Sequence, residues 1–296
     1  MRVEDGRQIE PVGAIAPGLP VFVDRDTEAH RLEEAIRKRD SLIIRGPAGM
    51  GKTALLSRVV QRLPPDLGIH CLYLRGMKDL QDLLRQLVRG LYDLKDPNLR
   101  HQLHAGGISA LTFEAWLNGL SSGQMKGTLY RTVEQGDYRV FLDHLPPLTH
   151  AVAKVIKELF WMRNTPVYLV IRDEAEQHLY QFNNFFYWGD RERLALQALP
   201  AQAAAELLES CIERFGLLRL DLAGFREETL VLSKRVPGAI VKMCALAADP
   251  QYQKGLRIKT KSVYIEYLMS GQHPLVHAPP SGGERSRQAG SLTSQG

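Results

Sequence analysis

Short, mostly apolar runs alternate with amphipathic segments along the first two thirds of the chain. The runs at residues 41–44, 69–74, 138–142 and 167–171 predict strands, and helical spacing of apolar residues marks segments 26–39, 54–63, 79–92 and 149–160. Strands that are apolar at nearly every position are buried on both faces, as in parallel sheets. The pattern therefore predicts an α/β fold, in which a parallel sheet carries helices on both faces.

The strand pattern is expected to stop near residue 190, where a helical region begins. Periodic segments predict helices at 201–215, 227–235 and 237–248, and a short helix at 262–269. Residues 93–136 are helical in patches separated by glycines and are the hardest to interpret. The expected organisation is a flexible N-terminal arm (1–20), an α/β core (21–189), a small all-helical lid with a C-terminal helix (190–270) and a disordered tail (271–296).

Composition narrows the class of protein. The 296 residues are 44% hydrophobic and 24% charged, which is ordinary for a globular protein with a core. Apolar runs fall short of the ~20 residues that span a bilayer, and the N-terminus lacks the apolar stretch of a signal peptide. Three scattered cysteines, without metal spacing, favour a reducing compartment, so we expect a cytoplasmic protein. The formal net charge of +5 permits contact with nucleic acid but does not require it.

A complete phosphate-binding loop follows the first predicted strand and opens a helix. The pattern G-x-x-x-x-G-K-[ST] spans residues 46–53. Its backbone N–H groups cradle phosphates, Lys52 reaches the β- and γ-phosphates, and the Thr53 hydroxyl ligates Mg²⁺. A plain glycine turn would not explain why lysine and threonine follow together. The expected nucleotide contacts are Gly46, Pro47, Ala48, Gly49, Met50, Gly51, Lys52, Thr53 and Ala54.

A second motif, at residues 138–143, is an apolar strand that ends in Asp143. An acid in this position beside a phosphate loop holds Mg²⁺ directly or through water, so Thr53 and Asp143 are the expected metal ligands. His144 comes next, where many hydrolytic proteins place an acid that orients the attacking water. Either His144 is the base, or another acid acts, or hydrolysis is slow; the plain alternative is sequence drift in a nucleotide switch. We favour slow turnover.

Further segments resemble a family. Residues 22–28 (FVDRDTE) are similar to the F-V-G-R-x-x-E box of AAA+ ATPases of the origin-recognition type and of STAND signalling ATPases, with Asp24 in place of glycine. The resemblance implies that Val23 and Arg25 flank the adenine and ribose; a helix start with a surface arginine is the structural alternative. It also implies that Arg172, at the end of the fourth strand, senses the γ-phosphate, unless it is a solvated strand end.

Two more positions carry implied roles. Residues 235–240 (RVPGAI) resemble the G-x-P or G-L-P-L-A segment of the helical lid, with Arg235 in place of glycine. There Pro237 would pack near the adenine, although it could simply start a helix. Arg163 stands at the junction where oligomeric AAA+ proteins present an arginine finger to a neighbour's nucleotide; an arginine near a helix end is the ordinary alternative.

These observations predict an AAA+/STAND-type ATP-binding module that acts as a nucleotide-dependent switch, with ATP and Mg²⁺ as cofactors and slow hydrolysis. Only one short helix fits after the lid, so we expect an isolated module that works with a protein partner or as a homo-oligomer, and not at a membrane. One alternative is an oligomeric, DNA-associated ATPase that assists transposition or replication; nucleic acid is a possible partner. The other is a scaffold that binds nucleotide without hydrolysing it.

Overall fold

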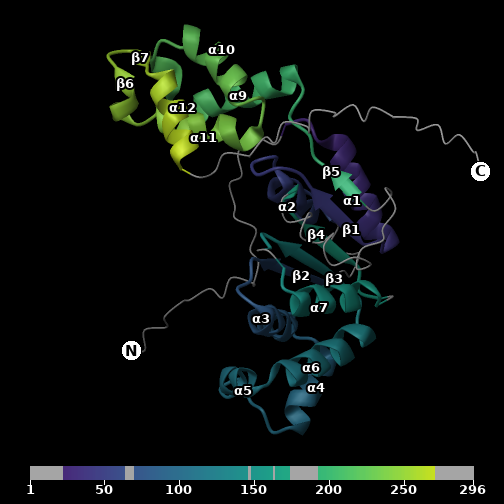
Figure 1. The fold of residues 1–296 in the computed structure, drawn as a ribbon. Helices are drawn as coiled ribbons and strands as arrows, with labels where there is room; N and C mark the ends of the chain where they lie inside the picture. Colours follow the sequence, from purple (N-terminus) through teal and green to yellow (C-terminus); the bar gives the residue numbers. More distant parts are fainter. Residues whose placement is uncertain (1–22, 64–69, 146–147, 163, 174–192, 271–296) are drawn as a thin grey trace, which may run out of the picture.

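A computed structural model describes residues 23–63, 70–145, 148–162, 164–173 and 193–270 (Figure 1). Within these residues, five parallel strands form one sheet in the order β2-β3-β4-β1-β5. The strands are β1 (Leu42–Arg45), β2 (His70–Arg75), β3 (Tyr138–Asp143), β4 (Val167–Val170) and β5 (Arg193–Ala195). The predicted parallel sheet is confirmed.

Strand β5 overturns the expectation that strands end near residue 190. It pairs with β1 in parallel, with Ile44 opposite Leu194. Only Leu194 of its three residues is buried, so the segment carries no apolar period that a sequence pattern could reveal. Its position makes β1 an interior strand, flanked by β4 on one side and β5 on the other.

Helices cover both faces of the sheet, as the apolar runs predict. Side chains alternate along β1, so that Leu42 and Ile44 face one buried cluster and Ile43 faces the other. Helices α1 (Asp26–Lys38) and α2 (Lys52–Arg62) contribute to the first cluster, and α3 (Leu80–Asp93) and α7 (His150–Phe160) to the second. Every position of β3 is buried, which explains why its residues other than Arg139 and Asp143 are apolar or aromatic.

The segment that was hard to interpret folds into three helices beyond α3. They are α4 (Pro97–Ala105), α5 (Phe113–Gly119) and α6 (Ser122–Gln135). Local signals set their starts: the Asp96 carboxylate accepts the Leu99 amide at 2.6 Å, and Ser121 and Gln124 form a reciprocal capping box. These helices lie at the end of the molecule opposite the C-terminal helices (Figure 1).

The C-terminal region, which we call the lid (residues 201–269), is helical apart from one short hairpin. The hairpin, formed by β6 and β7, was not expected in an all-helical region. Two other local signals are confirmed: Gly216 follows the end of α9 in a left-handed conformation, and Pro237 is the first residue of α11. The lid comprises α9 (Ala201–Arg214), η3 (Leu217–Arg219), α10 (Ala223–Leu232), α11 (Pro237–Ala247), η4 (Pro250–Tyr252), β6 (Gln253–Lys254), β7 (Arg257–Ile258) and α12 (Thr260–Met269).

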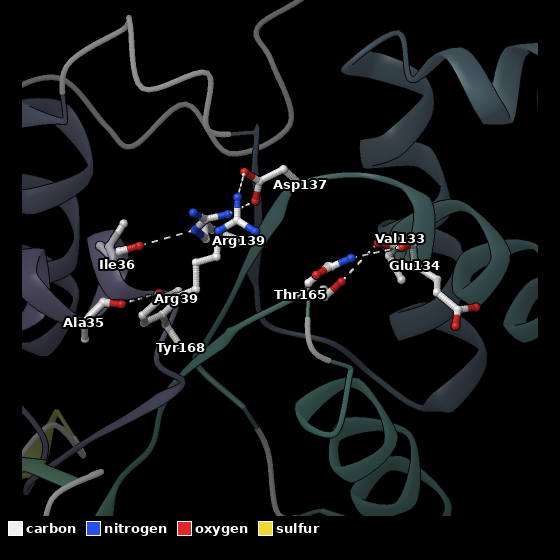
Figure 2. Close-up of polar contacts among 10 residues, drawn as sticks. Ala35, Ile36, Arg39, Val133, Glu134, Asp137, Arg139, Thr165 and Tyr168 are labelled. Atoms are coloured by element: carbon white, nitrogen blue, oxygen red, sulfur yellow. Dashed lines mark hydrogen bonds and ion pairs between the residues drawn. The ribbon is translucent and has the colours of Figure 1, made fainter.

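Polar contacts join the end of α1 to the amino ends of β3 and β4 (Figure 2). Arg39 donates to Asp137 at 2.6 Å, and the buried Arg139 also pairs with Asp137. The Tyr168 hydroxyl donates to the carbonyl oxygen of Ala35 at 3.3 Å. These contacts hold the end of α1 at the amino-terminal edge of the sheet. The phosphate-loop motif lies at the other edge, because it follows the carboxyl end of β1. No helix in the described part of the chain has the length and apolar character to cross a membrane.

Candidate nucleotide site

The phosphate-loop motif connects β1 to α2 by a turn that needs glycine. Gly51 precedes α2 with φ of 85°, in the left-handed region that glycine favours. A Cβ on Gly46 would lie 2.9 Å from the carbonyl oxygen of Leu196, so the chain that follows β5 packs directly against the loop. The first N–H groups of α2 have no partner within the helix, and such a terminus attracts anions.

Lys52 is the first residue of α2 and is held within this loop. Its ammonium group donates to the carbonyl oxygens of Gly46 and Pro47 at 2.7 and 2.8 Å, and the residue is 8% exposed. The charged group is therefore buried beside the helix terminus, where it would meet a phosphate.

Asp143 ends β3 and is 1% exposed. Its Oδ2 atom accepts the Tyr73 hydroxyl at 2.9 Å, and the Thr53 side chain is a further hydrogen-bond partner. Burial raises the pKa of this carboxyl group, but hydrogen bonds from His144, Thr53 and Tyr73 outweigh it and hold the pKa below its usual value. The aspartate is thus ionised at neutral pH and lies against the threonine of the loop, as the motifs predict.

His144 turns away from the strand direction. Its φ of 54° is left-handed, and its backbone N–H donates to Oδ1 of Asp143 at 2.8 Å. The imidazole Nδ1 lies 3.1 Å from Oδ2 of the same carboxylate, and 42% of the side chain is exposed. Because an ionised carboxylate only accepts, the N–H group at Nδ1 is the donor of this contact.

Arg172 follows β4, which lies between β1 and β3 in the sheet, so its backbone is placed between the loop and Asp143. The residue is exposed. Its neighbour Asp173 lies 3.8 Å from Arg45, at the end of β1. Arg163 is outside the described residues.

The lid touches the phosphate loop directly. The Gly238 amide, near the start of α11, donates to the carbonyl oxygen of Gly49 at 2.8 Å. A Cβ on Gly238 would lie 2.8 Å from the Cα of Gly49, a distance that real side chains do not reach. Pro237 is half-buried beside this contact.

Arg25 is buried and ties the segment before α1 to the connection between β5 and α9. Its guanidinium group donates to Glu28 at 2.8 Å and to the carbonyl oxygen of Gln197. Val23 is half-buried and packs against the cluster that includes the lid. The proposed contacts of Val23 and Arg25 with adenine and ribose stay predictions.

The structure thus brings Lys52, Thr53, Asp143 and His144 to one edge of the sheet. Sequence reasoning missed Tyr73 and the Gly49–Gly238 contact. The tyrosine lies within a predicted strand, but only the pairing register between β2 and β3 reveals that it faces Asp143.

Comparison with solved structures places this arrangement in a known fold. The Walker-type ATPase of Pyrococcus abyssi is similar at 15% identity and a TM-score of 0.56, over 85% of this chain and 74% of that chain. The ORC2 protein of Aeropyrum pernix matches at 16% identity and a TM-score of 0.52, over 84% and 69%. Cdc6p of Pyrobaculum aerophilum matches at 12% identity and a TM-score of 0.55, over 79% and 64%.

Sequence comparison adds nothing to this assignment: no protein-family model matches the chain, and no curated protein matches it. At these identities the structural similarity establishes the fold and not the activity. The chain has the AAA+ P-loop ATPase fold of these solved structures, an α/β core followed by a helical region.

Proposed function

We propose that this protein binds ATP and Mg²⁺ and acts as a nucleotide-dependent switch of the AAA+/STAND type, with slow ATP hydrolysis. The observation that carries the switch is the bond between Gly238 of the lid and Gly49 of the phosphate loop. Because the loop cradles the phosphates, any change in it on binding or losing a γ-phosphate would alter this contact and the position of the lid.

The residues at the edge of the sheet fit both cofactors. Lys52 and the amides at the start of α2 would hold the phosphates. Thr53 and Asp143 supply a hydroxyl and a carboxylate oxygen, the ligands that Mg²⁺ prefers, and Asp143 is held ionised. When bound, Mg²⁺ would neutralise charge on the β- and γ-phosphate oxygens. Arg172 would read the γ-phosphate, since a guanidinium group matches phosphate oxygens.

Hydrolysis at this site would depend on His144. Its Nε2 atom can take a proton from water while Nδ1 stays bonded to Asp143. Turnover is slow in this proposal, because the imidazole is turned aside by a left-handed backbone and bound to the carboxylate that would serve Mg²⁺. A scaffold that binds ATP without hydrolysis is the limiting case, and phosphate release equal to that of buffer alone would identify it.

The test of the site is Lys52→Ala, with Lys38→Ala as the control. Lys38 is an exposed lysine on α1 that pairs with Glu34. Binding of a fluorescent ATP analogue should be lost or severely weakened in Lys52→Ala and unchanged in Lys38→Ala. Added ATP should also raise the melting temperature of the wild type and the control, but not of Lys52→Ala. Equal affinity in all three proteins would refute the site assignment.

A second candidate is an oligomeric ATPase associated with DNA. It is favoured by Trp161, which follows α7, is 75% exposed and precedes Arg163 by two residues. An exposed tryptophan is typical of interface hot spots. This candidate predicts ATP-dependent assembly in light scattering and DNA-stimulated turnover that falls steeply with salt. Arg163→Ala would then reduce turnover without weakening ATP binding. A monomer in ADP, ATP and a non-hydrolysable analogue would exclude it.

A further inference from the structure

Tyr73 contacts the Asp143 carboxylate from a strand that belongs to neither sequence motif. It lies on β2, is 8% exposed, and its hydroxyl donates to Oδ2 of Asp143 at 2.9 Å. Tyrosine is an amphipathic residue whose hydroxyl needs a partner when buried, and here the partner is the candidate metal ligand.

The pairing of β2 with β3 accounts for this contact. Tyr73 lies opposite Phe141, and Asp143 is two residues further along β3, so all three side chains project from the same face of the sheet. A diagonal neighbour at this separation is within reach of a long aromatic side chain. This face of the sheet is covered by α1 and α2, and Lys52 and Thr53 are the first two residues of α2.

The donors around Asp143 constrain both oxygens of the carboxylate. Oδ2 accepts from Tyr73 and lies 3.1 Å from Nδ1 of His144, while Oδ1 accepts the backbone N–H of His144 at 2.8 Å. Because an ionised carboxylate only accepts, the phenol is the donor of its bond to Oδ2. Without it, Oδ2 would lose the one of these two contacts that comes from a buried side chain.

We propose that Tyr73 is a positioning residue, whose hydroxyl fixes the orientation of Asp143 for Mg²⁺ and, through the shared Oδ2 atom, the orientation of His144. The inference rests on the proposed function, since it assigns Tyr73 a role in the same site. Partners that orient a metal ligand in this way typically change metal affinity by about tenfold or more when they are removed.

The test compares Tyr73→Phe with Tyr168→Phe. Both substitutions remove a buried hydroxyl from a strand of the same sheet, but the Tyr168 hydroxyl bonds to the carbonyl oxygen of Ala35 at the far edge (Figure 2). Binding of a fluorescent ADP is titrated with Mg²⁺, and Mn²⁺ binding to the ADP complex is followed by electron paramagnetic resonance. Urea unfolding of each variant measures stability separately.

Tyr73→Phe should raise the Mg²⁺ and Mn²⁺ concentrations for half-saturation by about tenfold, with metal-free ADP affinity unchanged. Tyr168→Phe should leave the metal dependence at the wild-type value, whatever its effect on stability. Equal metal dependence of Tyr73→Phe and wild type would overturn the role of Tyr73 while leaving the nucleotide site intact. A wild type that binds ADP without any metal dependence, or binds no nucleotide, would overturn the proposed function together with this inference.

Discussion

The contact between the lid and the phosphate loop can be tested by one added methyl group. A Cβ on Gly238 would lie 2.8 Å from the Cα and 3.1 Å from the carbonyl oxygen of Gly49, both backbone atoms that cannot rotate away. Gly238→Ala must therefore push the start of α11 off the loop and stretch the 2.8 Å bond between the Gly238 amide and Gly49.

The expected magnitude combines three effects. Overpacking of this kind costs about 1–3 kcal/mol, and a lost backbone hydrogen bond costs about 1 kcal/mol. Alanine is favoured over glycine in a helix by at most about 1 kcal/mol, which offsets part of this loss. The free energy of unfolding should therefore fall by about 1–3 kcal/mol relative to wild type.

Gly224→Ala is the matched control. Gly224 is the second residue of α10, as Gly238 is of α11, but a Cβ there would meet no atom within 4 Å. In this variant only the higher helix propensity of alanine acts, so it should be as stable as wild type or more stable by up to about 1 kcal/mol. Urea unfolding of the three proteins gives the comparison. If Gly238→Ala unfolds at the same urea concentration as Gly224→Ala, the loop and lid are not in contact in solution.

Three further outcomes are expected. In His144→Asn, the asparagine tolerates the left-handed backbone but cannot accept the proton. Phosphate release should therefore fall by about 10²-fold or more, with the affinity for an ATP analogue unchanged. Phosphate release at the wild-type rate would exclude His144 as the base. Burial raises the pKa of Cys71 to about 11, so its alkylation by iodoacetamide, followed by mass spectrometry, should be slow at pH 8 and accelerate towards pH 11; rapid labelling at pH 8 would contradict this. Arg39→Gly loses an exposed ion pair with Asp137 but relieves the strain of a left-handed φ of 62°. Its free energy of unfolding in urea should therefore stay within about 1 kcal/mol of wild type. A larger loss would show that this ion pair stabilises the protein more than exposed pairs usually do.

The sequence predicts the sheet where a strand is long enough to show its burial. Tyr138–Asp143 is buried at all six positions and is predicted with its terminal aspartate, whereas Arg193–Ala195 has one buried residue and is missed. The same physical limit applies to α4 and α5, between α3 and α6. These two helices have nine and seven residues, with two buried apolar residues each, so no long apolar stripe marks them.

The candidate site is predictable where its residues share a local motif. Lys52 and Thr53 are fixed by their place at the start of α2, and Asp143 by its place at the end of β3. Tyr73 and Gly238 are not, because their contacts depend on strand register and on the approach of two segments far apart in the chain. Such contacts are set by tertiary packing, and a local sequence pattern carries no information about it.

Two positions that depart from the glycine of the resembling motifs keep the backbone turns that glycine favours. Asp24 and Arg235 stand where the resembling motifs have glycine, and their φ angles are 46° and 61°. A side chain in this region costs roughly 1–2 kcal/mol, so each turn must be held by its surroundings. At Arg235 the Leu199 amide donates to its carbonyl oxygen at 3.1 Å, and its own amide donates to Ser233. Because the turn at Arg235 leads directly to Gly238, the free-energy cost of its left-handed backbone falls beside the contact between the lid and the phosphate loop.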